Sequence, residues 1–197
     1  MVRIRSYQHL MDPDAPTAPL FSRDCLEIDI VVSAQTTLTV YVNHFKSMLG
    51  GRDATRERRR RQCAKVKEIV TDRFGANAGD EPFIVLGDFK DYLADVAQGT
   101  SGIADLVEWD QVENVVDRLP AADRWTHYWD SGNQYRQLDY ALLSRALADA
   151  NPGAPEIMRK GQPLRATQYT GLRFAGIGEH RPKASDHRPV TMALNLP

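Results

Sequence analysis

Long apolar runs and an excess of charge of either sign are missing from this chain of 197 residues. No uninterrupted apolar stretch approaches the roughly 20 residues that cross a bilayer, and the first residues lack a signal-peptide core, so we expect no membrane contact. The formal net charge of −1 gives no general attraction to nucleic acids or anionic lipids. Any binding of a polyanion must therefore come from a local cluster of charges.

Cysteine is also scarce, since Cys25 and Cys63 are the only two in the sequence. They lack the short spacing of a metal-binding CxxC pair, and we expect free, buried thiols rather than a disulfide. With 42% hydrophobic residues, the chain has enough apolar material for one core without crosslinks. The sequence shows no internal repeat and no low-complexity tract.

Apolar periodicity predicts a mixed α and β fold. Residues 1–22, with three prolines, are interpreted as a lead-in loop or short strand, and residues 23–197 as a single domain. Strands are expected at residues 25–32, 38–45, 83–87, 125–129, 138–144 and 188–196, the first two as a hairpin, and helices at residues 55–74 and 145–149. Residues 150–184 are expected to form a long irregular surface segment. This order predicts a layered α/β or α+β sandwich.

Four polar clusters each adjoin a strand-like apolar run. They are Asn43-His44-Phe45-Lys46-Ser47, Gly87-Asp88-Phe89-Lys90-Asp91, Gln137-Leu138-Asp139-Tyr140 and Ser185-Asp186-His187-Arg188. Taken singly, an aspartate after a strand is as often a turn former, and a histidine there can simply bond a loop. Acids and histidines at several strand ends together predict one convergent site. Such groups, with a divalent ion, supply what phosphoryl or acyl hydrolysis needs: an activated water, positive charge and a proton for the leaving oxygen.

Together these clusters resemble the motifs of the endonuclease/exonuclease/phosphatase superfamily, the metal-dependent phosphodiesterases related to pancreatic deoxyribonuclease. In chain order they are similar to its N-H-(L/F)-K-S, G-D-F-N, (L/I)-D-(Y/H) and S-D-H motifs. The resemblance covers about residues 23–197. It implies a deoxyribonuclease-like four-layer sandwich in which two mostly antiparallel sheets are flanked by helices.

The resemblance also implies catalytic roles. His187, polarised by Asp139, would act on the scissile phosphate or on its attacking water. Asp88 would orient or deprotonate that water and, with Asp186, would bind Mg²⁺ or Mn²⁺. His44 would donate to a non-bridging phosphate oxygen.

Further residues are expected to support these groups. Asn43, Lys46 and Lys90 would bind the substrate, and Asp24 would orient His44. Lys90 stands where the family motif has Asn, so a cation that only donates replaces an amide that donates and accepts. Lys90 either holds a phosphate oxygen or turns outward, and its charge would oppose a nearby metal ion.

The start of the chain also departs from the family pattern. The family's domain begins with strands that carry an Asn and a metal-binding Glu, for which this sequence has no counterpart before Val2. We therefore expect an N-terminally shortened version of the fold, or a partner chain or second copy that completes it. Glu27 and Asp29 lie on one face of the strand expected at residues 25–32. They either substitute as metal ligands or lie on a solvated face.

A cluster of five arginines lies between residues 56 and 61 at the expected start of the long helix, the end that prefers anions. Most must be solvated, but Arg59, Arg60 and Arg61 are also candidates for binding nucleic-acid phosphates. Trp125, Tyr128 and Trp129 could stack a base, with core packing expected for two of them.

The leading functional prediction is a divalent-metal-dependent phosphodiester hydrolase, a nuclease that cuts DNA by attack of water on phosphorus. One alternative is a phosphatase for a small phosphoester. The other is a catalytically impaired, shortened relative that binds DNA or a protein partner without cutting.

Overall fold

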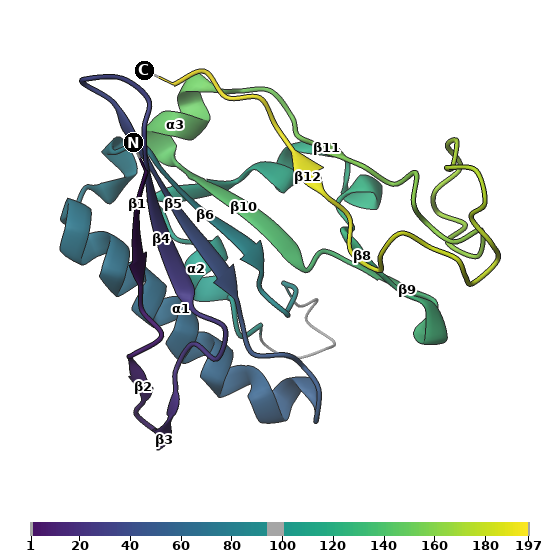
Figure 1. Ribbon diagram of the computed structural model, residues 1–197, viewed down its shortest axis with the longest axis horizontal. Coiled ribbons are helices and arrows are strands. Elements are labelled where there is room, and N and C mark those ends of the chain that lie inside the picture. Colours follow the sequence, from purple (N-terminus) through teal and green to yellow (C-terminus); the bar gives the residue numbers. More distant parts are fainter. Residues whose placement is uncertain (1, 94–100, 197) are drawn as a thin grey trace.

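The computed structural model describes residues 2–93 and 101–196, and its centre is a six-stranded sheet (Figure 1). In spatial order the strands are β1 (Val2–Ser6), β4 (Cys25–Val31), β5 (Thr37–His44), β6 (Phe83–Asp88), β10 (Asp139–Ser144) and β7 (Val112–Asn114). β5 and β6 run parallel, and every other pair of neighbours is antiparallel. The mostly antiparallel, mixed α/β architecture agrees with the prediction.

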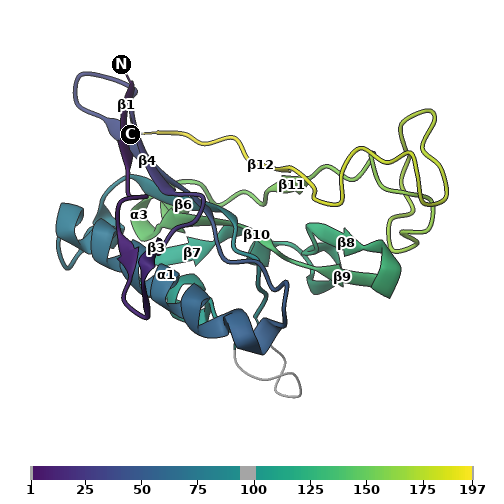
Figure 2. The ribbon, with the colours of Figure 1, turned by 60° about the horizontal axis from the view of Figure 1, so that its bottom comes forward.

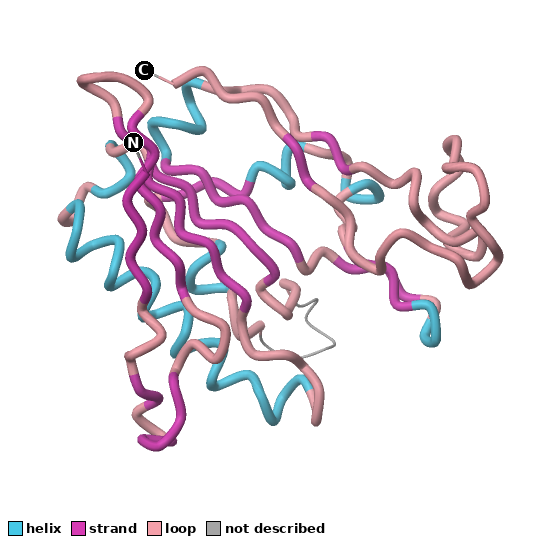
Figure 3. The backbone as a smooth tube through the Cα atoms, in the orientation of Figure 1, coloured by secondary structure: helices cyan, strands magenta, loops and turns pink. Residues whose placement is uncertain are grey.

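Smaller elements surround this sheet (Figure 3). Two-stranded pairs are formed by β2 (Met11–Asp12) with β3 (Ala15–Pro19), β8 (His127–Trp129) with β9 (Gln134–Arg136), and β11 (Glu156–Ile157) with β12 (Val190–Thr191). The helices are α1 (Arg52–Phe74), α2 (Ala104–Val107) and α3 (Arg145–Ala150). Among the described residues, no helix has the length and apolar character needed to cross a membrane.

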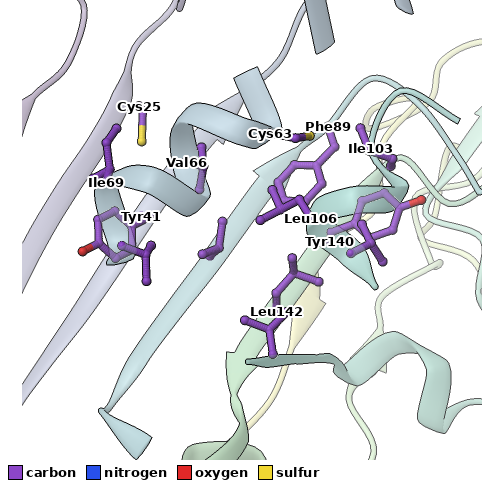
Figure 4. Packing of buried hydrophobic residues seen from close by; sticks show 14 of the residues in the cluster. Cys25, Tyr41, Cys63, Val66, Ile69, Phe89, Ile103, Leu106, Tyr140 and Leu142 are labelled. Carbon is purple, nitrogen blue, oxygen red and sulfur yellow. The ribbon is translucent and has the colours of Figure 1, made fainter. Parts of the chain in front are cut away.

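Helix α1 covers one face of the sheet. Its side chains Cys63, Val66 and Ile69 pack against residues such as Tyr41 and Leu142 of the strands (Figure 4). The helix starts three residues earlier than the periodicity predicts, because the Arg52 side chain is held by the Asp91 carboxylate and the Tyr92 carbonyl. Both cysteines are buried and free, which confirms the prediction for them.

The predicted hairpin is formed by β4 and β5, but the orientation of β4 corrects one expectation. Glu27 and Asp29 face α1 and are buried. Glu27 accepts hydrogen bonds from Arg5, Tyr7 and Arg73. Asp29 accepts from Thr39 at 2.9 Å and pairs with Arg73 at 2.8 Å. These carboxylates are therefore neither solvated nor free to bind a metal ion, because cations from β1 and α1 neutralise them.

The opposite face of the sheet is covered in part by the end of the chain (Figure 2). Met192, Leu194 and Leu196 pack there against a cluster that includes Ile84 and Leu143. A strand over residues 188–196 was expected, but only Val190–Thr191 pairs with another strand. The alternation of apolar residues reflects packing on the sheet rather than a long ladder. Towards β1 this face is exposed at Val2, Ile4 and Ile30.

The remaining predictions are met in part. The irregular segment at residues 150–184 contains only the two-residue strand β11, and the expected strand at 125–129 and helix at 145–149 correspond to β8 and α3. The lead-in is more ordered than expected, because β1 pairs with β4, and β2 and β3 form a hairpin of their own. The sequence predicts residues 91–108 to be partly helical or looped, and residues 94–100 of this stretch lie outside the described residues.

Candidate active site

Three of the predicted site residues lie side by side on adjacent strands. His44 at the end of β5 is in register with Asp88 at the end of β6, and Asp88 is in register with Asp139 at the start of β10. Residues paired in this way point to the same face of a sheet. The sheet register alone therefore brings an imidazole and two carboxylates together, on the face opposite α1.

His187 completes this cluster from the end of the chain. Its Nδ1 lies 2.8 Å from Asp139 Oδ2, and its Nε2 lies 3.6 Å from Asp88 Oδ2. On the other side, His44 Nε2 lies 3.8 Å from the same Asp88 oxygen. Three residues named by the motifs, His44, Asp139 and His187, therefore lie around Asp88.

The surroundings of the two histidines shift their pKa values in opposite directions. The hydrogen bond to Asp139 raises the pKa of His187 above its ordinary value, although burial opposes this. Burial lowers the pKa of His44, with Asp88 acting against this and the Arg23 guanidinium in the same direction. The site therefore pairs one imidazole that favours its charged form with one that favours its neutral form.

A third histidine, His127 on β8, adjoins the cluster, although no sequence motif predicts it there. It forms an isolated β-bridge with His187, their ring centroids are 4.8 Å apart, and its Nε2 lies 3.9 Å from Asp186 Oδ2. Burial, and then the nearby His187, lower the pKa of His127 to about 4, so its ring is neutral at pH 7. Aromatic alternation predicted a strand here, but no motif linked that strand to His187.

The loop after β6 turns Lys90 towards the cluster. The backbone of Lys90 has a φ of 53°, its N–H donates to Asp88 Oδ1 at 3.0 Å, and its Nζ lies 2.6 Å from Asp88 Oδ2. Of the two orientations left open by the sequence, the structure shows the inward one. The turn starts at Gly87, whose φ is 133° and where a Cβ would lie 1.9 Å from the Asn43 carbonyl oxygen. Only glycine fits that position.

Two pockets flank Lys90. The first, of about 230 Å³, is lined by Ser22, Arg23, His44, Phe45, Lys46, Ser47 and Lys90. Three cations at its wall suit a phosphate group. The second, of about 440 Å³, shares Ser47 and Lys90 with the first and includes His127, Trp129 and Arg136. Trp129 is 52% exposed, whereas Trp125 and Tyr128 are buried, as expected for two of these three aromatics.

Two predicted supporting residues lie elsewhere. Asn43 is 2% exposed and its Nδ2 donates to the Tyr41 carbonyl, because alternation along β5 turns it to the α1 face, away from His44. Asp24, with a φ of 84°, accepts from the Tyr7 backbone N–H at 2.8 Å. The side chain that lies against His44 is instead Arg23, whose Nη1 is 3.1 Å from His44 Nδ1. These positions correct the roles expected for Asn43 and Asp24.

The arginine cluster is largely occupied by carboxylates of the chain itself. Arg59 is fully buried, where its Nε donates to Asp91 Oδ2 at 2.9 Å and its Nη1 to the Lys46 carbonyl at 3.2 Å. Its expected contact with a nucleic-acid phosphate is therefore corrected: its guanidinium ties α1 to the loops that carry Lys46 and Lys90. Arg61 pairs with Asp12, and Arg60 lies at 3.5 Å from Glu57 on the helix surface.

The donors at the centre of the cluster fit a divalent cation. Asp88, Asp139 and His187 each offer one ligand atom, and these atoms lie within 4.8 Å of one another. Carboxylate oxygens suit Mg²⁺ and Mn²⁺, and an imidazole is acceptable to Mn²⁺. The predicted ligand Asp186 is not in this group within the described part of the chain, and its carboxylate lies beside His127. Its role as a ligand stays a prediction.

Solved structures with the same fold were found, although no protein-family model and no curated protein matches the sequence. The AP endonuclease LMAP from Leishmania major aligns with 96% of this chain and 60% of its own, at a TM-score of 0.56 and 15% identity. An endonuclease/exonuclease/phosphatase family protein from Bacteroides thetaiotaomicron aligns with 96% of this chain and 62% of its own, at a TM-score of 0.54 and 12% identity. The 3'-5' exonuclease NExo from Neisseria meningitidis aligns with 98% of this chain and 70% of its own, at a TM-score of 0.53 and 16% identity. The chain thus spans about three fifths of the first two structures.

Proposed function

We propose that this chain, which has the endonuclease/exonuclease/phosphatase fold, is a divalent-metal-dependent phosphodiester hydrolase and acts as a nuclease on DNA. The observation that carries the proposal is the convergence of His44, Asp139 and His187 on Asp88, next to a pocket lined by cations. If Asp88 only formed a turn, it would not need His187 beside it, held in place by the second carboxylate, Asp139.

In the proposed reaction each group has one task. Asp139 accepts the Nδ1–H of His187, which fixes the tautomer and leaves Nε2 facing Asp88. Asp88 orients the attacking water and accepts its proton, and the imidazolium of His187 donates a proton to the leaving oxygen. His44 and Lys46 donate to non-bridging oxygens. Water adds to phosphorus as the leaving oxygen departs, without a covalent enzyme intermediate.

Asp88 is the proposed ligand of Mg²⁺ or Mn²⁺, with Asp186 as the second. A cation there would lower the pKa of a bound water and offset the negative charge of the phosphate. The carboxylates supply the hard oxygen donors that such ions prefer. Metal dependence is therefore part of the proposal.

The composition of the two pockets, and not the arginine cluster, supports DNA as the substrate. Arg23, Lys46 and Lys90 line a phosphate-sized pocket, and the half-exposed Trp129 lines its neighbour. A cationic site next to an exposed aromatic ring is the arrangement with which proteins hold a nucleotide of a single strand. The names of two structural neighbours, an AP endonuclease and an exonuclease, point the same way.

Two other functions remain as alternatives. A phosphatase for a small phosphoester would use the 230 Å³ pocket alone. A relative that binds DNA or a protein partner without cutting is favoured by one observation, the ion pair between Lys90 and Asp88, which occupies the proposed ligand.

Incubation with plasmid DNA, a chromogenic phosphodiester and a chromogenic phosphomonoester separates these functions. We expect plasmid cleavage with Mn²⁺ or Mg²⁺ that stops with chelator, falls steeply with salt and is lost in His187→Ala. Hydrolysis of the monoester alone, indifferent to salt, would indicate the phosphatase. Plasmid that is retarded on a gel but intact would indicate the non-cutting relative. Cleavage that survives both chelator and His187→Ala would contradict the mechanism.

A further inference from the structure

Lys90 and Asp88 form a contact that bears on how a metal ion enters the site. We propose that Lys90 and a divalent cation compete for the same oxygen of Asp88, so that binding of the cation displaces the Lys90 ammonium from the carboxylate. The inference rests on the proposed function in one respect, the assignment of Asp88 as a metal ligand.

Both oxygens of Asp88 are engaged by this one residue. The Lys90 backbone N–H donates to Oδ1 at 3.0 Å, and Lys90 Nζ lies 2.6 Å from Oδ2. Both side chains are mostly shielded from solvent, at 22% and 14% exposure. The contact between Nζ and Oδ2 is a close ion pair, and in such a shielded place solvent screens it less than a surface pair.

The other groups around this oxygen are weaker competitors. His187 Nε2 and His44 Nε2 lie 3.6 Å and 3.8 Å from Asp88 Oδ2, beyond hydrogen-bond distance. A hard cation bound at that oxygen would lie close to the ammonium, and like charges repel strongly where water is scarce. Among the described residues, Lys90 makes the closest contact with Oδ2, so its ammonium must leave before Asp88 can act as a ligand through that oxygen.

The structure offers the displaced ammonium a place to go. Lys90 lines both the 230 Å³ and the 440 Å³ pockets, and its four-carbon stem is flexible. Released from Asp88, it can donate to a substrate oxygen in the first pocket, beside Lys46. The metal cation would thus replace Lys90 at Asp88, and the phosphate would replace Asp88 as the partner of Lys90. A neutral residue at position 90 could not make this exchange.

The test measures metal binding without substrate, by calorimetry and by the Mn²⁺ electron paramagnetic resonance signal. It compares the full chain with Lys90→Asn, Lys90→Met and, as matched control, Lys46→Met, which removes a lysine from the same pocket but not from Asp88. Asn tolerates the left-handed backbone of position 90, so at least one variant is expected to fold. Asp88→Asn identifies the site.

We expect both Lys90 variants to bind Mn²⁺ at least about tenfold more tightly than the unmodified chain, the effect of removing one opposite charge that shifts a carboxylate by about one pKa unit. Lys46→Met should change the Mn²⁺ affinity by much less. When Asp88→Asn is combined with either Lys90 variant, the gain in affinity should disappear. Equal or weaker binding by the folded Lys90 variants would overturn the proposal, as would an equal gain in Lys46→Met. Failure of the proposed function appears separately, as absence of phosphodiester cleavage, because this test uses no substrate.

Discussion

His187 Nδ1 lies 2.8 Å from Asp139 Oδ2, and this contact joins the end of the chain to the first residue of β10. The β8 segment holds both partners in place: Thr126 Oγ1 accepts from the Asp139 backbone N–H at 3.0 Å, and the Tyr128 N–H donates to the Asp186 carbonyl. The imidazole of His187 is therefore fixed from two sides, by a carboxylate and by a backbone bridge.

The first prediction concerns the protonation of His187. In chelated protein, nuclear magnetic resonance titration should give His187 a pKa above the ordinary value of about 6.5, and Asp139→Asn should lower it. Because the folded-state pKa is raised, the stabilisation is complete below the unfolded pKa and is lost as pH rises through the folded pKa. The stability advantage over Asp139→Asn should thus shrink as the pH rises above about 6.5 and through the raised pKa of His187. Identical pKa values in the two proteins would contradict this account.

Gly87 gives a second prediction, on stability. Gly87→Ala would place a Cβ 1.9 Å from the Asn43 carbonyl oxygen at a φ of 133°, so β5 and β6 would have to separate. We expect a loss of about 3 kcal/mol or more in the free energy of unfolding, measured with urea. Gly153→Ala is the matched control, because nothing lies within 4 Å of its added Cβ, and it should change stability by less than about 0.5 kcal/mol. Similar values for the two variants would show that the close approach at Gly87 is not rigid.

Arg59 provides the third prediction. Arg59→Met leaves the buried Asp91 with one cation fewer and the Lys46 carbonyl without its donor, and we expect it to cost about 3 kcal/mol of unfolding free energy. Arg60→Met, at a half-exposed arginine on the same helix, should cost less than about 0.5 kcal/mol. If Arg59→Met were as stable as Arg60→Met and instead lost only DNA affinity, Arg59 would have the substrate role first expected from the sequence.

Strands β4, β5, β6 and β10 were predictable from local apolar patterns, and these place His44, Asp88 and Asp139 at strand ends. The contact of His187 with Asp139, 48 residues away, was expected only from the family motifs. Alternation fixes which residues of β5 share a face, and the parallel orientation of β5 and β6 follows from a strand, a long helix and a strand in succession. His44, Asp88 and Asp139 thus needed no long-range information beyond the order of strands.

Other features depend on contacts that no local pattern encodes. Alternation separates Glu27 and Asp29 from Ile28 but does not say that the acidic face is the buried one, since that depends on Arg73 at the far end of α1. The same holds for Arg59, whose partner Asp91 lies 32 residues away, and for His127 beside His187. The expected completion of the fold by a partner chain or second copy stays a prediction.

The most direct measurement of the central claim is the rate of DNA cleavage with Mn²⁺ by the unmodified chain, by His187→Ala and by His9→Ala. His9 is an exposed histidine in the turn between β1 and β2 and controls for preparation and fold. We predict that His187→Ala lowers the rate by about 10²- to 10⁴-fold, the usual contribution of a positioned acid or base, and that His9→Ala leaves it unchanged. Equal cleavage by all three proteins would show that the cluster around Asp88 is not the active site.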